Sequence, residues 1–349
     1  MIKVLIVEDS PVAREFLIYI LTSDPAIQVI GTASNGAEAL ETFARKKPDV
    51  ITMDIHMPMM DGFETTRRIM ETFPTPIIIV SGSGGGKEVP SAFRALEAGA
   101  LAIIPRPPGI HHEMFETASK ELIRTVKLLS EVKVVRRIPG LSAGRTAGPS
   151  RRAIPLRATG RIRAVAIGAS TGGPVVLQKI LSDLPKDFPA PVFIVQHIAQ
   201  GFVAGFAEWL SGASRFPISI ARQAEIPAPG HGYVAPDNFH LGLGNDLRIM
   251  LSDEAPENGL RPSVSYLFRS VAGALGPAAA GVLLTGMGND GAKEFKTLKE
   301  RGAVTIAQDE ASSVIYGMPG AAIELGAAMH VLSPEGIAAI LVDLLKEPK

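Results

Sequence analysis

The chain has 349 residues, more than one hydrophobic core usually organises, so we expect two domains. Hydrophobic residues make up 46% and charged residues 20%, which excludes an intrinsically disordered protein. The formal net charge is +0, so no overall charge attracts the chain to nucleic acid or an anionic membrane. Cysteine is absent, which excludes disulfides, thiolate metal sites and a cysteine nucleophile.

The first part of the chain, residues 1–130, alternates apolar runs with helical patterns. The runs that predict strands are KVLIVED, QVIGTAS, DVITMDI, PIIIVSG and LAIIP. Helices are expected to begin near Val12, Ala37, Phe63, Val89 and His112. Because parallel strands need crossover connections, this alternation predicts a doubly wound parallel sheet, the flavodoxin-like α/β class.

Acidic side chains follow two of these runs. Glu8 and Asp9 end the first strand and Asp54 ends the third, and such strand ends meet where the strand order of a doubly wound sheet reverses. Carboxylates gathered there repel one another, and a hard divalent cation relieves the repulsion. Ser81 ends the fourth strand and could bind an added phosphoryl oxygen. Each residue alone could equally be a helix N-cap or a turn residue.

A basic segment follows the first domain. Residues 131–160 contain seven arginines and lysines against the single acid Glu131, with glycine, proline, serine and alanine between them. This composition favours a solvated interdomain linker. A nucleic-acid-binding arm is the alternative, although aromatic residues are missing and no helix-turn-helix pattern follows that would make the chain a transcription factor.

A second α/β series occupies residues 161–349. The strands are predicted at AVAIGAS, PVFIVQH, AGVLLTG and AVTIAQ, with helical stretches between them. Shorter runs and turn signals between Pro217 and Ser252 predict an antiparallel excursion. The second domain is therefore expected to be another doubly wound α/β domain with a short antiparallel part.

Neither of two apolar stretches predicts a membrane segment. The first residues, MIKVLIVEDS, place acids directly after a short apolar run, unlike a signal peptide. The uncharged stretch from Ser270 to Asn289 is interrupted by glycines and a proline, which favours a helix end, a turn and a strand. We expect a cytoplasmic protein with no direct membrane insertion.

A possible serine nucleophile lies at the first strand of the second domain. Ser170 stands within Gly168-Ala169-Ser170-Thr171-Gly172, a G-x-S-x-G pattern between a strand and a helix. Such a turn lifts the hydroxyl above the sheet and places backbone N–H groups at a helix N-terminus, where an oxyanion is stabilised. The same glycine-rich turn could instead bind a phosphate, although no Walker lysine follows.

A serine nucleophile needs a base and an orienting acid. His197 ends the strand PVFIVQH and should emerge at the same sheet edge, whereas the other histidines lie at turns, strand starts or a helix start. Asp290 follows another strand in the glycine-rich LLTGMGNDG and could orient the base, or simply cap the next helix. The order serine, histidine, aspartate differs from that of the α/β-hydrolase fold.

The first domain resembles response-regulator receiver domains on the strength of Glu8, Asp9, Asp54 with MPMMDG after it, and Ser81. The resemblance implies that Asp54 accepts a phosphoryl group and that Ser81 is the switch hydroxyl. It also implies Mg²⁺ held by Glu8, Asp9, Asp54 and the backbone carbonyl of His56. The usual lysine after the fifth strand is replaced by Arg106, whose planar guanidinium can still neutralise a phosphoryl group.

Over nearly its full length the chain resembles the CheB family of chemotaxis methylesterases. The motifs that carry the resemblance are IGASTGG, VQH, APDNFH, RPSVSYLF, LLTGMGNDGA and TIAQDEASSVIYGMPGAA. It implies a Ser170–His197–Asp290 triad, with Thr171 beside the nucleophile and the backbone of Met287 in the oxyanion hole. It implies hydrolysis of γ-glutamyl methyl esters on methyl-accepting chemotaxis receptors, deamidation of particular receptor glutamines, and a chemotaxis histidine kinase as phosphodonor. No metal is expected for the hydrolysis itself.

Three positions depart from the family's pattern: Ala199, Ser265 and Gly320. We expect them to affect surface and substrate contacts more than the triad. Two other functions remain compatible with the sequence. One is the same chemistry on a chemosensory receptor outside chemotaxis, and the other is a non-catalytic binding module controlled by a receiver.

Overall fold

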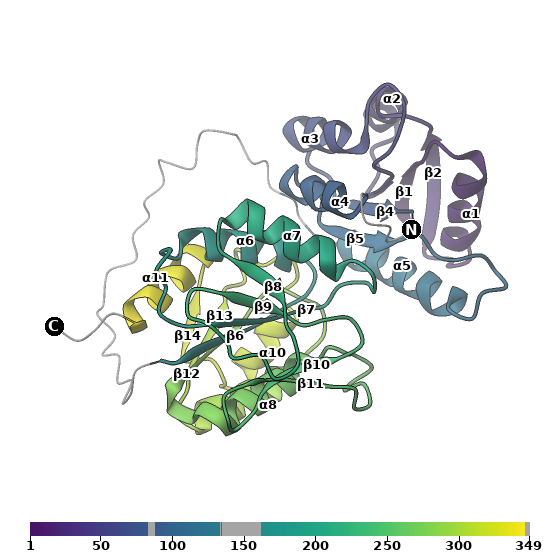
Figure 1. Ribbon diagram of the computed structural model, residues 1–349. Coiled ribbons are helices and arrows are strands. Elements are labelled where there is room, and N and C mark those ends of the chain that lie inside the picture. Colours follow the sequence, from purple (N-terminus) through teal and green to yellow (C-terminus); the bar gives the residue numbers. More distant parts are fainter. Residues whose placement is uncertain (83–87, 133, 135–161, 346–349) are drawn as a thin grey trace. The chain divides into compact units, whose positions relative to one another are not determined.

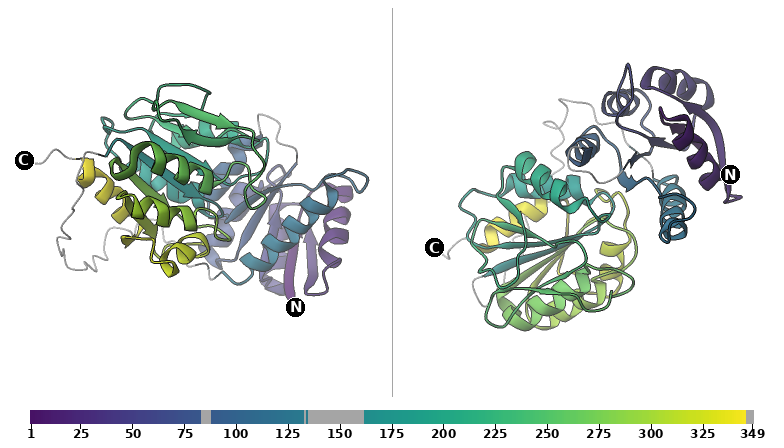
Figure 2. Two further views of the ribbon diagram at one scale, coloured as in Figure 1. Left: turned by 90° about the horizontal axis from the view of Figure 1, so that it is seen from below. Right: turned by 45° about the vertical axis from the view of Figure 1, so that its right-hand side comes forward.

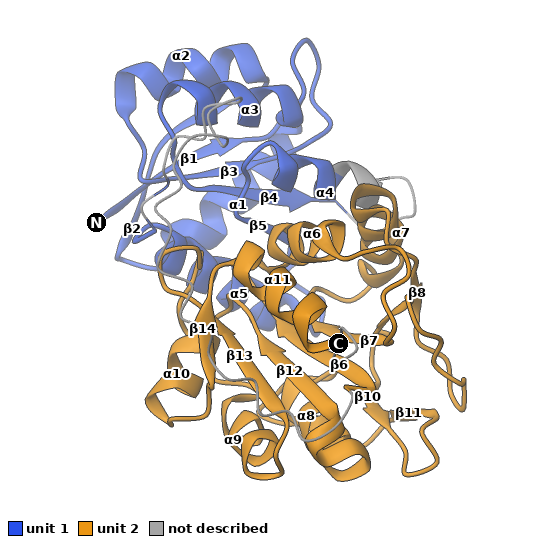
Figure 3. Ribbon diagram, turned by 90° about the vertical axis from the view of Figure 1, so that its left-hand side faces the viewer, with its two compact units in different colours: residues 1–153 blue, residues 154–349 orange. Residues whose placement is uncertain are grey.

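The computed structural model describes residues 1–82, 88–132, 134 and 162–345. The chain divides into two compact units, residues 1–153 and 154–349 (Figure 3). Most of the predicted linker, 131–160, lies outside the described residues. No helix among the described residues is long and apolar enough to span a bilayer.

The first unit is a five-stranded parallel sheet in the order β2-β1-β3-β4-β5, so the strand order reverses between β1 and β3. Helices α1 and α5 cover one face and α2, α3 and α4 the other (Figure 1). The strands are β1 (Ile2–Val7), β2 (Ile27–Ala33), β3 (Val50–Met53), β4 (Ile77–Ser81) and β5 (Ala102–Pro105). The helices are α1 (Pro11–Thr22), α2 (Gly36–Lys46), α3 (Gly62–Thr72), α4 (Glu88–Glu97) and α5 (Phe115–Leu129).

Local sequence explains where most helices of this unit begin. The side chains of Ser10, Asn35 and Asp61 cap α1, α2 and α3 by accepting from backbone N–H groups of the first turn. Helix α5 begins three residues later than expected, because His112 lies in a turn before it. The Nδ1 of His112 accepts a hydrogen bond from the Met114 N–H. The flavodoxin-like fold predicted for this unit is confirmed.

The second unit is a seven-stranded sheet in the order β14-β13-β12-β6-β7-β9-β8, parallel throughout, with the order reversing between β12 and β6. Helices α6, α7 and α11 cover one face and α8, α9 and α10 the other (Figures 1 and 2). The strands of this sheet are β6 (Ala164–Ala169), β7 (Val192–Gln196), β8 (Ile218–Ile220), β9 (Gly232–Val234), β12 (Ala279–Leu283), β13 (Val304–Gln308) and β14 (His330–Leu332). The helices are α6 (Gly173–Asp183), α7 (Val203–Ser214), α8 (Val264–Leu275), α9 (Ala292–Glu300), α10 (Met318–Glu324) and α11 (Pro334–Leu345), with the 3-10 helix η1 (Gly276–Ala278).

The short antiparallel part expected between Pro217 and Ser252 is confirmed, in the second half of that range. Only β10 (His240–Leu243) and β11 (Ile249–Ser252) pair antiparallel, in a separate two-stranded sheet. The expectation was wrong for β8 and β9, which extend the main sheet in parallel. These strands have three residues each, too few to show a burial period, so the sequence pattern does not give their pairing direction.

Candidate functional site: two sheet edges

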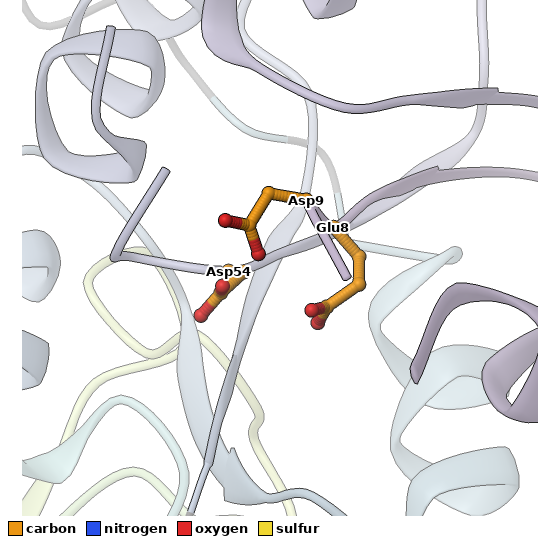
Figure 4. A group of neighbouring side chains, drawn as sticks. All are labelled: Glu8, Asp9 and Asp54. Atoms are coloured by element: carbon orange, nitrogen blue, oxygen red, sulfur yellow. The ribbon is translucent and has the colours of Figure 1, made fainter. Parts of the chain in front are cut away.

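The predicted acidic residues lie together in the first unit. Glu8 and Asp9 directly follow β1, and Asp54 directly follows β3, the neighbouring strand at the point where the order reverses. One carboxylate oxygen from each residue lies within 4.8 Å of those of the other two. Figure 4 shows the three side chains side by side. His56, two residues beyond Asp54, has an exposed side chain.

Burial and like charge make this cluster costly to ionise. Burial, together with the nearby charge of Asp54, raises the pKa of Glu8 to about 7 against the opposing effect of Arg106. Burial also raises the pKa of Asp54, although the Ile55 N–H donates to its Oδ1 at 2.7 Å. Oxygen-only donors that repel one another fit a hard divalent cation, which would neutralise them.

Arg106 enters the cluster from β5. Its Nη2 lies 2.6 Å from Glu8 Oε2, and its backbone N–H donates to the Ser81 carbonyl at 2.7 Å. Within the described part of the chain, its buried Nε has no acceptor and the buried Ser81 hydroxyl makes no hydrogen bond. One guanidinium edge therefore pairs with Glu8 while other donors stay available beside the acidic cluster.

The second unit places Ser170 at its own point of reversal, directly after β6. The Ser170 N–H donates to the Thr285 carbonyl at 3.0 Å, and the Ser170 carbonyl accepts from the Gly173 N–H at 2.8 Å. Gly172 has φ +79°, and a Cβ there would lie 2.6 Å from a Val314 methyl. The turn into α6 therefore needs glycine for both conformation and space.

A second glycine brings the end of β12 against the nucleophile. A Cβ on Gly286 would lie 2.6 Å from the Ser170 Cβ, so the two main chains approach as closely as a missing side chain allows. Met287 follows Gly286. Among the described residues, the backbone N–H groups of Thr171 and Met287 have no acceptor. Two free N–H donors thus flank the half-buried Ser170, as an oxyanion hole requires.

His197 follows β7, the other neighbour of β6, and pairs with Asp290 from the loop after β12. Its Nε2 lies 2.9 Å from Asp290 Oδ2, and its backbone N–H donates to the Ala169 carbonyl at 2.9 Å. An ionised carboxylate only accepts, so Nε2 carries the proton and Nδ1 is left as the basic nitrogen. In the described part of the chain neither Nδ1 nor the Ser170 hydroxyl has a hydrogen-bond partner.

Asp290 is held by a set of donors at the start of α8. Ser263 Oγ donates to Oδ1 at 2.8 Å, the Val264 N–H to Oδ2 at 2.7 Å, and the Ser265 N–H to Oδ1 at 3.2 Å. Burial opposes ionisation, but His197 and the α8 donors outweigh it and hold the Asp290 pKa at about 2. The aspartate therefore remains a carboxylate throughout the neutral range.

Two of the three residues that depart from the family's pattern are more deeply buried than expected. Ser265 is 3% exposed, and besides its bond to Asp290 its Oγ accepts from the Gly291 N–H at 3.0 Å. The expectation that it acts at the surface was wrong, because the first turn of α8 packs onto the Asp290 loop. Gly320 is also buried, and a Cβ there would lie 3.1 Å from the Tyr316 ring. Ala199 is half-buried, two residues after His197.

Sequence reasoning missed the residues that support Asp290. Ser263 is the N-cap of α8, and its N–H donates to Nδ1 of the fully buried His240 at 3.2 Å. His240 Nε2 lies 3.2 Å from the Ala255 carbonyl, so both of its ring nitrogens are engaged. The motif RPSVSYLF contains the cap, but only the fold reveals that the same serine contacts a residue 27 positions later.

The chain was compared with known proteins. A family model described as CheB methylesterase matches residues 165–341, and one described as response regulator receiver domain matches residues 4–113. The protein-glutamate methylesterase/protein-glutamine glutaminase of Nitrosospira multiformis is 55% identical over 347 residues, covering 99% of this chain and 98% of its own. Enzyme 1 of that name from Syntrophus aciditrophicus is 55% identical over 345 residues, covering 99% and 98% respectively.

Among solved structures, the CheB methylesterase catalytic domain of Thermotoga maritima matches with a TM-score of 0.51 and 38% identity, covering 52% of this chain and 98% of its own. The match has the length of a single catalytic domain, which agrees with the division into two units. The full-length relatives contain both parts in one chain. The chain belongs to the CheB family of protein-glutamate methylesterase/protein-glutamine glutaminases.

Proposed function

We propose that Ser170, His197 and Asp290 form the catalytic triad of a methylesterase that hydrolyses γ-glutamyl methyl esters on methyl-accepting chemotaxis receptors in the cytoplasm. The same triad deamidates particular receptor glutamines. The observation that carries the proposal is the 2.9 Å pair of His197 Nε2 with the Asp290 carboxylate, at the edge where Ser170 leaves β6. It leaves Nδ1 as a base at the edge that presents the serine.

In the proposed mechanism, the Ser170 hydroxyl attacks the ester carbonyl while His197 Nδ1 takes its proton. The tetrahedral oxyanion accepts hydrogen bonds from the N–H groups of Thr171 and Met287. His197 then returns the proton to the departing methoxide, which leaves as methanol, or to the departing amine, which leaves as ammonia. Water, deprotonated by the same nitrogen, hydrolyses the acyl-enzyme and regenerates Ser170.

Asp290 supplies a permanent negative charge in this cycle. It holds the Nε2–H tautomer and stabilises the imidazolium that forms when Nδ1 takes the proton. Its pKa of about 2 means that the proton stays on His197 and does not pass to the carboxylate. The three α8 donors therefore keep the base in one tautomer throughout the reaction.

Control of the reaction is assigned to the first unit. Asp54 accepts the phosphoryl group from a chemotaxis histidine kinase, and this raises the rate of hydrolysis. Glu8, Asp9, Asp54 and the His56 carbonyl would hold Mg²⁺, which would neutralise the incoming phosphoryl group when bound. Arg106 supplies a further positive charge, and Ser81 supplies a hydroxyl from the end of β4.

The first test measures methanol release from methylated chemoreceptor membranes, with and without a small-molecule phosphodonor. We expect Ser170→Ala to lower the rate by about 10⁴-fold or more, since residual catalysis without a triad member comes from binding and the oxyanion hole. Ser182→Ala on α6 is the matched control, because Ser182 is exposed and bonds only within its helix. Asp54→Ala should retain the unstimulated rate and lose stimulation by the phosphodonor.

Two outcomes would contradict the proposal. A Ser170→Ala protein that releases methanol at the wild-type rate would exclude the triad. Wild-type protein that binds receptor membranes but releases no methanol, even with phosphodonor, would favour the non-catalytic binding module. Activity confined to receptors of another chemosensory pathway would retain the chemistry and change the substrate.

A further inference from the structure

Gln196, the last residue of β7, lies between the nucleophile and the base. Its Nε2 donates to the Ser170 carbonyl at 2.9 Å and to the His197 carbonyl at 2.9 Å. The residue is 4% exposed. The two protons of one side-chain amide are thus shared between the peptide groups that carry the two reacting side chains.

The orientation of this amide is determined by its surroundings. Both facing atoms are carbonyl oxygens, which only accept, so the NH₂ group must point toward them and Oε1 away. Among the described residues, the buried Oε1 has no donor. It lies toward the first turn of α6, where a Cβ on Gly173 would come within 2.3 Å of it. The missing side chain at Gly173 makes room for the amide in this orientation.

We propose that Gln196 is a positioning residue, whose amide sets the distance between the Ser170 hydroxyl and the His197 imidazole. This inference rests on the proposed triad. Ser170 and His197 have no hydrogen bond between their side chains, so their relative placement depends on the backbone that carries them. The backbone bond from the His197 N–H to the Ala169 carbonyl aligns β7 with β6, and the amide extends this alignment one residue further on both strands.

Loss of this amide should affect the chemical step more than substrate binding. Gln196 is almost completely buried below the edge, so a receptor segment does not reach it. A displacement of about 1 Å between reacting groups typically costs about 100-fold in rate. We expect kcat to fall by roughly 10- to 100-fold with KM unchanged when the two hydrogen bonds are lost.

The test uses the full-length protein with Gln196→Met, which keeps the side-chain volume, and Gln196→Glu, which replaces the NH₂ donor by oxygen. The matched control is Gln178→Met, because Gln178 on α6 makes one long bond, 3.5 Å, to the Ala213 carbonyl. Three quantities are measured: the rate at which a fluorophosphonate labels Ser170, kcat and KM for methanol release, and the thermal unfolding midpoint. Ser170→Ala gives the labelling background.

The expected result is slower labelling and lower kcat in both Gln196 variants at a temperature where each remains folded, with KM close to that of Gln178→Met. A folded Gln196→Met protein that is labelled and turns over at the control rate would overturn the inference. So would a loss explained by a raised KM or by a lowered midpoint alone. If the wild-type protein is not labelled, Ser170 is not the nucleophile and the inference about Gln196 fails with it. Failure of the proposed triad is thereby distinguished from failure of the Gln196 inference alone.

Discussion

Asp54 and Asp290 occupy equivalent places in two different sheets, yet their charges are controlled in opposite ways. Each aspartate is buried, 7% and 3% exposed, at the carboxyl edge of a parallel sheet. Burial raises the pKa of Asp54, whereas the pKa of Asp290 is lowered to about 2. Burial therefore does not decide whether the pKa of each aspartate is raised or lowered, because it opposes ionisation of both residues.

The groups around each aspartate decide the direction of its pKa shift. Asp54 shares its edge with two other carboxylates, and the Ile55 N–H and the Arg106 guanidinium do not offset its burial. Asp290 has no second carboxylate in its set of partners and accepts from His197, Ser263 and the first backbone N–H groups of α8. An incompletely neutralised cluster is suited to taking up a cation and a phosphoryl group. A fully hydrogen-bonded carboxylate is suited to holding a histidine in one place.

The largest expected effect on activity comes from removing the charge of Asp290. Asp290→Asn should lower kcat for methanol release by about 10³- to 10⁴-fold, because an amide can donate to Nε2 and would favour the wrong histidine tautomer. Asp246→Asn, at an exposed turn, is the control. A loss below tenfold in folded protein would show that the charge of Asp290 does not hold the histidine in its tautomer.

Removal of divalent cations should impair only the function of Asp54. EDTA should abolish the whole stimulation by phosphodonor, because Glu8, Asp9 and Asp54 then lack the charge that makes their edge receptive. Methanol release without phosphodonor should be unchanged, since the Asp290 edge contains no comparable carboxylate cluster among the described residues. The check is a titration with EDTA, reversed by Mg²⁺. Equal loss of both rates would contradict this division.

A smaller effect is expected from weakening the donor set. Ser263→Ala removes the 2.8 Å bond to Oδ1, and a hydrogen bond to a charged group contributes about 1.5–3 kcal/mol. We expect kcat to fall by about tenfold, since the α8 N–H groups and His197 remain. The pKa of Asp290, followed by ¹³C NMR of its carboxyl carbon, should rise. Ser182→Ala again serves as control, and an unchanged pKa would contradict the account.

The smallest effect on activity is expected from adding a second carboxylate beside Asp290, as Asp54 already has in the first unit. Ser265→Asp would place another carboxylate beside Asp290, while still accepting from the Gly291 N–H. Activity at neutral pH should change by only a few-fold, but the pKa of Asp290 should rise by about one unit through like-charge repulsion.

The pH dependence of stability gives the sign of this effect. A carboxylate with a lowered pKa stabilises the fold fully above its ordinary pKa of 3.8, and this contribution is lost as the pH falls toward about 2. In Ser265→Asp the raised pKa of Asp290 should make this loss smaller and should complete it at a higher pH. Chemical unfolding followed between pH 5 and pH 2 checks the shift, with Ser182→Ala as the reference. Superimposable curves would show that like charge does not control Asp290.

Sequence patterns predicted both sheets because their central strands are continuous apolar runs between helical patterns. They failed for β8 and β9, where three residues show no period, and for the direction of their pairing. They also placed Ser170 and His197 at strand ends and Asp290 in the loop after a strand, and the carboxyl ends of parallel strands share an edge.

The supporting contacts were not predictable in the same way. Arg106 and Glu8 are 98 residues apart, Ser263 and Asp290 are 27 apart, and Gln196 has the pattern of any buried strand residue. Each contact depends on how two elements pack, which no periodicity encodes. Ser265, which departs from the family pattern, was misjudged for this reason, since it looks like a surface residue until α8 is placed on the Asp290 loop.

The use of Nε2 for Asp290 has a consequence for chemical trapping. In the familiar serine-protease arrangement the carboxylate takes Nδ1, and electrophilic affinity labels that capture the base react at the outer nitrogen. Here the outer nitrogen is occupied and only 11% of the His197 side chain is exposed, so the lone pair open to alkylation is on the nitrogen nearer the main chain. A haloketone that seats in this site should therefore yield an Nδ1-alkylated histidine, and its regiochemistry, resolved by fragmentation of the labelled peptide, records how the ring was held.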